Sequence, residues 1–357
     1  MDIKATPYSN LKLFAHSDKL DAIKKGIWTA PIYIRIKPTN ACNHHCNYCH
    51  YGNGQYLNLD GQDERNHIPW EKMQEIVEDI GDMGVKAITF SGGGEPLVYP
   101  YIIQTMKAML NRNIELSIIT NGHKLNGEIA EILTNAKWVR ISLDSANAET
   151  YSKIRNISLD SFGQVCKNIN MFAKAKPDNC ELGINFVINR DNYDQVYEAG
   201  KLMFNLGVNH IKYAARITTD VNSYHAPIRD KVIEQINRVK DEFENPKFKV
   251  INLYEDDFHF SSVFQRSYTK CIVTKAVTVI AADSKVYFCH DKAYLENGII
   301  GDLKNRSFKE LWFSPETQEK YKNFDASKEC KHHCVYDSRN ILLNTFLSLD
   351  ENHINFI

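Results

Sequence analysis

Short apolar runs alternate with longer segments of helical periodicity through the first two-thirds of the chain. The β-rich runs lie at 32–37, 86–90, 115–119, 138–142, 182–188 and 209–213. Apolar residues recur at helical spacing in 70–83, 101–111, 162–175 and 193–206. This alternation predicts parallel strands joined by crossover helices. We therefore expect an α/β fold, a partial (β/α)6 TIM-like barrel whose chemistry lies at the carboxyl ends of the strands.

The pattern changes in the last third of the chain. A helix is predicted at 227–243, a strand near 248–253, and further helices at 307–313, 315–323 and 338–347. Two β-runs, 276–282 and 285–289, are separated by Asp283 and Ser284 and predict a hairpin. We expect a small α+β domain here. The predicted division is an N-terminal extension at 1–30, the barrel at 31–255, the small domain at 256–335, and a C-terminal helix and tail at 336–357.

Charge and hydropathy narrow the possible partners. The 43 basic and 44 acidic residues nearly cancel and form no block of like charge, so we expect neither nucleic acid nor membrane as a partner. The first 20 residues lack an apolar signal segment, and the run at 276–282 is too short to cross a bilayer. We expect a cytoplasmic protein. The polar stretch 53–67 predicts a long surface loop.

Nine cysteines fall into two groups and two single positions. Three lie within 42–49 and four within 271–334, with Cys166 and Cys180 between them. Because no secretion signal is evident, a disulfide framework is not expected. Metal binding or catalysis is the better interpretation.

Cys42, Cys46 and Cys49 form a C-x3-C-x2-C pattern directly after the first predicted strand. Three thiolates this close together predict a loop around a metal centre. On a [4Fe–4S] cluster, three protein ligands leave one iron open to a substrate or cosubstrate. A closed zinc site with a fourth ligand is the alternative. The histidines that could supply this ligand are His44, His45 and His50.

The cysteine motif, with Tyr48 before its last cysteine, resembles the signature of the radical S-adenosylmethionine (SAM) enzymes. SGGGEP at 91–96 follows the second strand, where that family has its GGEP motif, and TNG at 120–122 and SLDS at 142–145 also lie at strand ends. The resemblance implies a [4Fe–4S] cluster whose open iron binds SAM. A one-electron donor such as flavodoxin or ferredoxin would then drive cleavage to a 5′-deoxyadenosyl radical, which abstracts hydrogen from the substrate.

The resemblance also implies SAM-binding residues. Gly93 and Gly94 would allow close backbone approach, and Glu95 would receive the SAM amino group. Ser142 and Arg155 resemble the pair that contacts the ribose and the SAM carboxylate, which the planar arginine fork suits. A surface position for Arg155 and a backbone-bonded hydroxyl for Ser142 are the alternatives.

Cys271 and Cys289 bracket the predicted hairpin, and Cys330 and Cys334 follow as C-x3-C. Four thiolates can hold a complete [4Fe–4S] cluster or a structural zinc ion. With the segment 300–312 between them, the cysteines resemble the auxiliary-cluster extension called SPASM, or twitch in its one-cluster form. We expect one auxiliary cluster.

One-cluster members of this group include the 2-deoxy-scyllo-inosamine dehydrogenase and the GTP cyclase of molybdopterin biosynthesis. The resemblance therefore implies dehydrogenation of a small polyol, sugar, aminocyclitol or nucleotide-sugar, with the auxiliary cluster accepting the second electron. A sugar epimerase is one alternative, with Cys166 or Cys180 as the hydrogen donor. A peptide-modifying (RiPP) enzyme and a non-enzymatic zinc or iron–sulfur sensor are the others.

The acid/base residue is not evident. Arg216 after the sixth strand and Glu255 after the next are weak candidates for deprotonating or holding substrate, and both could be surface charges. His332 and His333 lie in a polar segment, so we expect them to be solvated. Cys166 is expected in the core, Cys180 at the end of the barrel opposite the active site, and Trp312 in helix packing.

Overall fold

The computed structural model describes residues 8–51, 63–255, 264–350 and 352–356. Seven parallel strands form the barrel and follow one another in chain order within the sheet. They are β1 (Tyr33–Ile36), β2 (Ala87–Phe90), β3 (Glu115–Thr120), β4 (Trp138–Ser142), β5 (Glu181–Ile188), β6 (His210–Ala215) and β7 (Lys249–Asn252). The six predicted barrel strands are confirmed. The strand near 248–253 pairs with β6 and adds a seventh.

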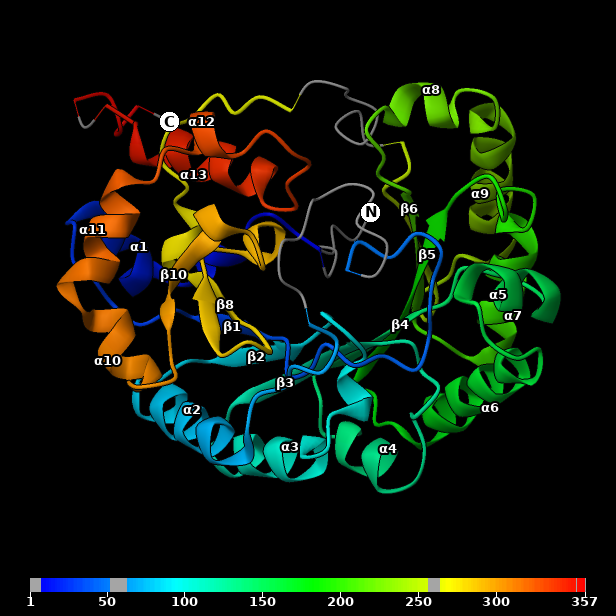
Figure 1. Cartoon of the computed structure of the whole chain (residues 1–357). Coiled ribbons are helices and arrows are strands. Elements are labelled where there is room, and N and C mark those ends of the chain that lie inside the picture. The colour runs from blue at the N-terminus through cyan, green and yellow to red at the C-terminus, as the bar shows by residue number, and fades with distance from the viewer. Residues whose placement is uncertain (1–7, 52–62, 256–263, 351, 357) are drawn as a thin grey trace.

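Helices lie outside the curved sheet (Figure 1). The predicted helices appear as α2 (Trp70–Asp82), α3 (Ile102–Asn111), α6 (Asp160–Ala175), α7 (Val196–Leu206) and α9 (Arg229–Phe243). Three further helices within the barrel were not predicted: α4 (Gly127–Leu133), α5 (Ala148–Arg155) and α8 (Val221–His225). The short α5 is capped by the Asn147 side chain, which accepts from Thr150 N at 2.9 Å.

The two faces of the barrel strands differ in burial. Ile34 and Ile36 on β1 are fully buried in the main core, whereas Tyr33 and Arg35 on the other face are half-buried. The same alternation recurs along β4. Because successive side chains of a strand point to opposite faces, the half-buried set lines the inside of the barrel.

The C-terminal part extends the same sheet. β8 (Val277–Ile280) pairs in parallel with β1, and β9 (Lys285–Tyr287) and β10 (Ile299–Asp302) continue antiparallel. The predicted hairpin is thus confirmed, and Ser284 takes a left-handed φ of 61° in its turn. The remaining helices are α10 (Phe308–Phe313), α11 (Pro315–Asn323), α12 (Ala326–Glu329) and α13 (Asp337–Leu347).

The chain's N-terminal segment packs on this C-terminal part. Leu20 and Ile23 of α1 (Ser17–Lys24), which follows η1 (Lys12–Ala15), share a core cluster with Val273 and Tyr336. Trp312 is fully buried, as expected, and stacks on Trp28 with ring centroids 5.2 Å apart. Cys289 and Cys334 belong to the same core cluster, so these two cysteines are held by packing against the N-terminal segment.

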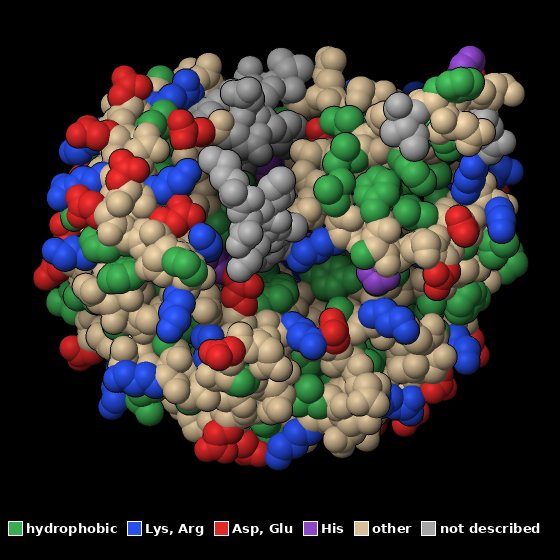
Figure 2. All heavy atoms as spheres, turned by 180° about the vertical axis from the view of Figure 1, so that it is seen from behind, with side chains coloured by type: hydrophobic (Ala, Val, Ile, Leu, Met, Phe, Trp, Pro, Cys, Tyr) green, Lys and Arg blue, Asp and Glu red, His purple; other side chains and the backbone are tan. Residues whose placement is uncertain are grey.

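Charges of both signs are interspersed on the face that Figure 2 shows, without a field of one sign. No helix in the described ranges is long and apolar enough to span a membrane. The domain boundary near 255 stays a prediction. Most of the loop expected at 53–67 lies outside the described residues, and its described end pairs with the barrel, Thr39 with His67.

Candidate active site

The three N-terminal cysteines lie on the loop that follows β1, and the GGEP segment after β2 is hydrogen-bonded to the start of that loop. Gly94 N donates to Thr39 O and Glu95 N donates to Ala41 O, both at 2.9 Å. A Cβ atom on Gly94 would come within 2.0 Å of Ala41 O, and one on Gly93 within 2.3 Å of Asn40 Oδ1. Position 94 therefore needs glycine for the two segments to meet, because the Cβ would meet backbone there, whereas at position 93 it would meet the ends of side chains.

The other side of the loop is held by α5. His45 N donates to Arg155 O and Asn47 N donates to Ile154 O, both at 3.0 Å. These bonds use carbonyls at the end of the helix that have no intrahelical partner. The loop is thus fixed between two elements that follow different barrel strands.

Arg155 is buried and joins this loop to the end of β4. Its guanidinium donates to Cys46 Sγ at 3.4 Å and to Ser142 O at 2.9 Å, and it forms an ion pair with Asp144. Tyr48 OH donates to the same Asp144 carboxylate. Only 4% of Arg155 is exposed, so the alternative of a surface residue is wrong. Its contact with SAM stays a prediction.

Glu95 is buried at the same end of the barrel. Its carboxylate accepts from Leu97 N at 3.0 Å, Thr120 Oγ1 at 2.6 Å and Asn121 N at 2.7 Å. Burial raises the pKa of Glu95 and these donors oppose the rise. A carboxylate can accept about four hydrogen bonds, so capacity remains for the predicted SAM amino group. The side chain also fixes the ends of β2 and β3 relative to one another.

The N-terminal cysteines suit an iron–sulfur cluster. Burial raises the pKa of Cys42 to about 12 and that of Cys46 in the same direction, so their thiolates need a nearby cation. Backbone and guanidinium donors already point at sulfur, His44 N at Cys42 Sγ (3.4 Å) and Arg155 at Cys46. Such donors are typical of iron–sulfur ligation.

A single-ion site fits less well. Within the described ranges, no three His, Cys, Asp or Glu side chains converge closely enough to hold one metal ion. A cubane binds each thiolate through a different iron, so its ligands stand further apart than those of a zinc ion. The donors to the Cys42 and Cys46 sulfur atoms, rather than the spacing of the cysteines, therefore favour the cluster over zinc.

The four C-terminal cysteines come together from three segments. Cys271 precedes β8, Cys289 follows β9, and Cys330 and Cys334 lie between α12 and α13. The charge of each of Cys271, Cys289 and Cys330 raises the pKa of at least one other, although burial is the larger cause. Such mutual effects require that the sulfur atoms lie close together.

Asn340 is a residue of this second group that sequence reasoning missed. Its Nδ2 donates to Cys271 Sγ at 3.2 Å, and its Oδ1 accepts from Val273 N at 3.0 Å. Tyr336 N adds a donor to Cys334 Sγ at 3.4 Å. The sequence carried no signal for Asn340, because its burial on α13 is visible only in the structure.

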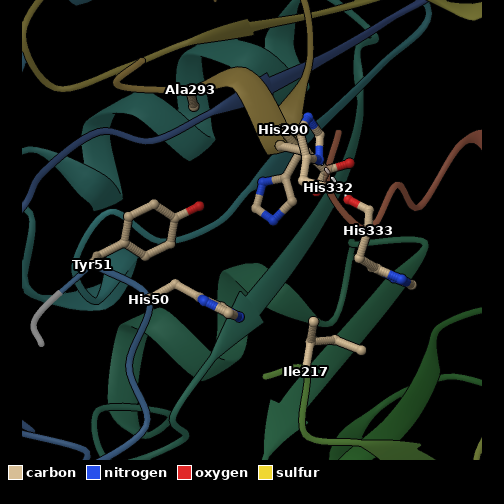
Figure 3. A pocket seen from close by; sticks show the side chains of 8 residues that line it. His50, Tyr51, Ile217, His290, Ala293, His332 and His333 are labelled. Atoms are coloured by element: carbon tan, nitrogen blue, oxygen red, sulfur yellow. Dashed lines mark hydrogen bonds between the residues drawn. The ribbon is translucent and has the colours of Figure 1, made fainter. Parts of the chain in front are cut away.

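A cavity of about 60 Å³ separates the two cysteine groups. Figure 3 shows His50, Tyr51 and His290 turned toward its centre, with His332 and His333 at one side. His50 and Tyr51 follow Cys49, whereas the other lining histidines flank the C-terminal cysteines. The expectation that His332 is solvated is wrong, because it is 9% exposed and its Nδ1 donates to His333 O at 2.7 Å. His333 is half-buried.

The weak candidates lie at different distances from this cavity. Arg216 is half-buried at the end of β6 beside Ile217, a cavity residue, and its guanidinium lies 5.8 Å from the Tyr48 ring centroid. Glu255 is exposed and accepts from Asn252 Nδ2. Asn189 was missed: it directly follows β5, is fully buried, and its Nδ2 has no hydrogen-bond partner. A polar residue at the end of a buried strand could have indicated it.

The two unassigned cysteines lie away from the cavity. Cys180 is buried beside Leu133 O at the amino end of β5, opposite the cysteine loop as expected. Cys166 is half-buried on α6 rather than in the core. Neither residue lines the cavity.

Comparison with known protein families finds one match in the N-terminal part of the chain and another in the C-terminal part. Residues 36–203 match the radical SAM superfamily, and residues 271–335 match an iron–sulfur cluster-binding domain, SPASM. A probable GTP 3′,8-cyclase of Saccharolobus islandicus is 26% identical over 50% of this chain and 54% of its own length. One from Methanocaldococcus jannaschii is 28% identical over 63% of this chain and 74% of its own length. The chain thus spans about half the length of the first of these relatives.

Solved structures show the same fold. Streptococcus suis SuiB bound to S-adenosylmethionine has a TM-score of 0.63 at 18% identity, covering 90% of this chain and 75% of SuiB. Native anSMEcpe with bound AdoMet has a TM-score of 0.59 at 19% identity, covering 89% of this chain and 96% of anSMEcpe. The matched segments contain both cysteine groups, and they imply SAM, a [4Fe–4S] cluster and an auxiliary cluster as cofactors. The chain thus carries a radical SAM domain over residues 36–203 and a C-terminal SPASM iron–sulfur cluster-binding domain over residues 271–335.

Proposed function

We propose that this enzyme is a radical SAM oxidoreductase that dehydrogenates a small polyol, sugar, aminocyclitol or nucleotide-sugar. The observation that carries the proposal is the cavity between the two cysteine groups, whose lining comes from the residues that follow or flank both of them. A substrate there would be in reach of a hydrogen-abstracting centre on one side and an electron acceptor on the other.

The cofactor-binding residues follow from the placement of the loops. Cys42, Cys46 and Cys49 would hold the first cluster, and Cys271, Cys289, Cys330 and Cys334 the auxiliary one. The SAM site would comprise Gly93, Gly94, Glu95, Ser142 and Arg155. When bound, SAM and the first cluster supply a 5′-deoxyadenosyl radical, and the auxiliary cluster supplies a one-electron acceptor. Flavodoxin or ferredoxin would serve as the external electron donor.

The chain's own residues position and enclose the substrate. Oxidation of an alcohol carbon removes one hydrogen atom from carbon, one proton from the hydroxyl and one electron. Arg216, at the edge of the cavity, suits the binding of a substrate oxygen. Tyr51 OH accepts from the buried Lys37 Nζ at 2.6 Å, which fixes the phenol in the cavity wall. Glu255 remains a weaker candidate, since it is exposed.

Peptide modification is the second candidate. Among the structures with the same fold, one is SuiB bound to the precursor peptide SuiA, and another is anSMEcpe with a bound peptide. Their identity to this chain is 16–17%, which supports the fold rather than the substrate. Epimerisation is disfavoured, because neither Cys166 nor Cys180 lines the cavity.

Anaerobic turnover tests the proposal. We expect SAM cleavage to 5′-deoxyadenosine to be stimulated by a member of a panel of polyols, sugar phosphates and nucleotide-sugars, with a product two electrons more oxidised than the substrate. An isomeric product would contradict dehydrogenation. Stimulation by peptides alone would establish the second candidate instead.

A further inference from the structure

Three cationic side chains lie on the inner face of the barrel. Arg35 on β1, Arg140 on β4 and Lys212 on β6 are half-buried, and the residues before and after each of them are fully buried against the helices. The strand alternation therefore points all three into the barrel. Closed barrels of this class usually fill this space with branched apolar side chains. Here the lining is basic and partly accessible.

No acidic side chain among the described residues forms an ion pair with these cations. Arg35 is hydrogen-bonded to the Tyr33 phenol, and Arg140 lies 5.7 Å from the Trp138 ring centroid. Lys212 Nζ lies 5.3 Å from the ring centroid of Tyr8. The Nε atoms of Arg35 and Arg140 are buried without a hydrogen-bond partner. Two other buried arginines in the described chain do have carboxylate partners: Arg155 pairs with the buried Asp144, and Arg266 with the partly buried Asp337.

Lys212 feels the charges of both arginines. Burial lowers the pKa of Lys212 well below its usual value, and the charges of Arg140 and Arg35 lower it further. The charge of Arg35 also lowers the pKa of Lys37, and the charge of Asp291 partly offsets this effect. The Lys37 ammonium in turn donates to the cavity residue Tyr51. The basic interior thus continues into the cavity between the cysteine groups. Clustered cations without counter-ions are unfavourable unless a bound anion compensates them.

We propose that Arg35, Arg140 and Lys212 bind an oxyanion of the substrate, a phosphate ester or a carboxylate. This inference rests on the proposed small-molecule function and narrows it to anionic substrates such as sugar phosphates or nucleotide-sugars. Two arginine forks suit the oxygens of such a group, and lysine adds a point charge. The SAM carboxylate is expected at the carboxyl ends of the strands, near Ser142, whereas Arg140 lies two residues earlier on β4.

Calorimetry on the reconstituted enzyme under anaerobic conditions and with saturating SAM tests this site, with inorganic phosphate and acetate as probes. Arg140→Met and Lys212→Met should each weaken phosphate binding about tenfold, since each removes a charge-assisted hydrogen bond. Lys174→Met, on the exposed face of α6, is the matched control and should bind as wild type. Tighter binding of acetate than of phosphate would assign the site to a carboxylate.

Unchanged phosphate affinity in both variants, or no phosphate binding to the SAM-saturated wild-type enzyme, would overturn the inference. If the methionine variants do not fold, Arg140→Lys replaces them. This variant keeps the positive charge but loses the bidentate guanidinium, so it should still weaken phosphate binding several-fold. Release of 5′-deoxyadenosine is measured in parallel. Intact SAM cleavage without phosphate binding refutes only the oxyanion site, whereas loss of cleavage in the wild-type enzyme refutes the proposed function.

Discussion

The guanidinium of Arg155 lies 3.4 Å from the Sγ atom of Cys46, although 109 positions separate the two residues along the chain. The same guanidinium is paired with the buried carboxylate of Asp144 at the end of β4. Since His45 N also binds Arg155 O, the end of α5 fixes the cysteine loop through both its backbone and its side chain. This contact links the barrel fold directly to the candidate cluster site.

Replacing Arg155 tests that link. Arg155→Met should lower the free energy of unfolding by about 3–5 kcal/mol, because it leaves Asp144 buried without a counter-charge. The loop should also lose iron more readily. Chemical denaturation and iron analysis measure the two effects. The double variant Arg155→Met/Asp144→Asn should recover part of the stability, and a single variant as stable as wild type would contradict the structural role of the pair.

Glycine at position 94 is required by the contact with Ala41 O. Gly94→Ala should weaken SAM binding at least about tenfold, because the added Cβ displaces the GGEP segment from the cysteine loop. Equilibrium binding of SAM to the reconstituted enzyme measures this. Gly163→Ala on α6 is the matched control: its Cβ meets nothing within 4 Å, so binding should be unchanged and stability should rise by about 0.5–1 kcal/mol.

The Asn340 amide should tune the second cysteine group. Asn340→Leu removes the donor to Cys271 Sγ and leaves Val273 N without its acceptor, so we expect a loss of about 1–3 kcal/mol in unfolding free energy. If an auxiliary cluster is bound there, its reduction potential should become more negative, because a donor to sulfur favours the reduced state. A redox titration followed by electron paramagnetic resonance gives the potential. An unchanged potential would separate Asn340 from the cluster.

Lys19 predicts a pH dependence of stability. Its Nζ is buried against Thr29 and Ala30, and burial lowers its pKa to about 8. Between pH 8 and 10.5 the folded state has lost this proton and the unfolded state still holds it, so stability should rise with pH in that window. Lys19→Met should remove the rise, about 1–3 kcal/mol. The exposed Lys25→Met is the control, and a pH profile identical in both variants would count against the burial effect.

Most of the barrel could be predicted from the sequence, because each strand is a short run of β-branched and aliphatic residues bounded by turns. Three helices could not: α4, α5 and α8 have 5–8 residues, too few for helical periodicity to stand out. The pairing of β8 with β1 was also missed, since local pattern carries no information about which distant strands meet.

The parts of the site that consist of residues at fixed spacing along the sequence could be predicted. The parts that depend on how distant residues pack together could not. The two cysteine groups and the GGEP turn are readable as motifs. Asp144 and Asn340 became visible only once burial was known, because an isolated polar residue has the same appearance in a solvated loop as in a core. The basic lining of Arg35, Arg140 and Lys212 requires the register of three strands.

The central claim is that two separate cysteine groups each hold a [4Fe–4S] cluster on either side of one cavity. Iron analysis of three anaerobically reconstituted proteins tests it most directly. Wild type should bind about eight iron atoms, and the variants Cys42→Ala/Cys46→Ala/Cys49→Ala and Cys289→Ala/Cys330→Ala/Cys334→Ala about four each. The first variant should lose SAM cleavage, and the second should retain it without forming oxidised product. Zinc in place of iron in wild type, or the loss of all iron from either variant, would contradict the account.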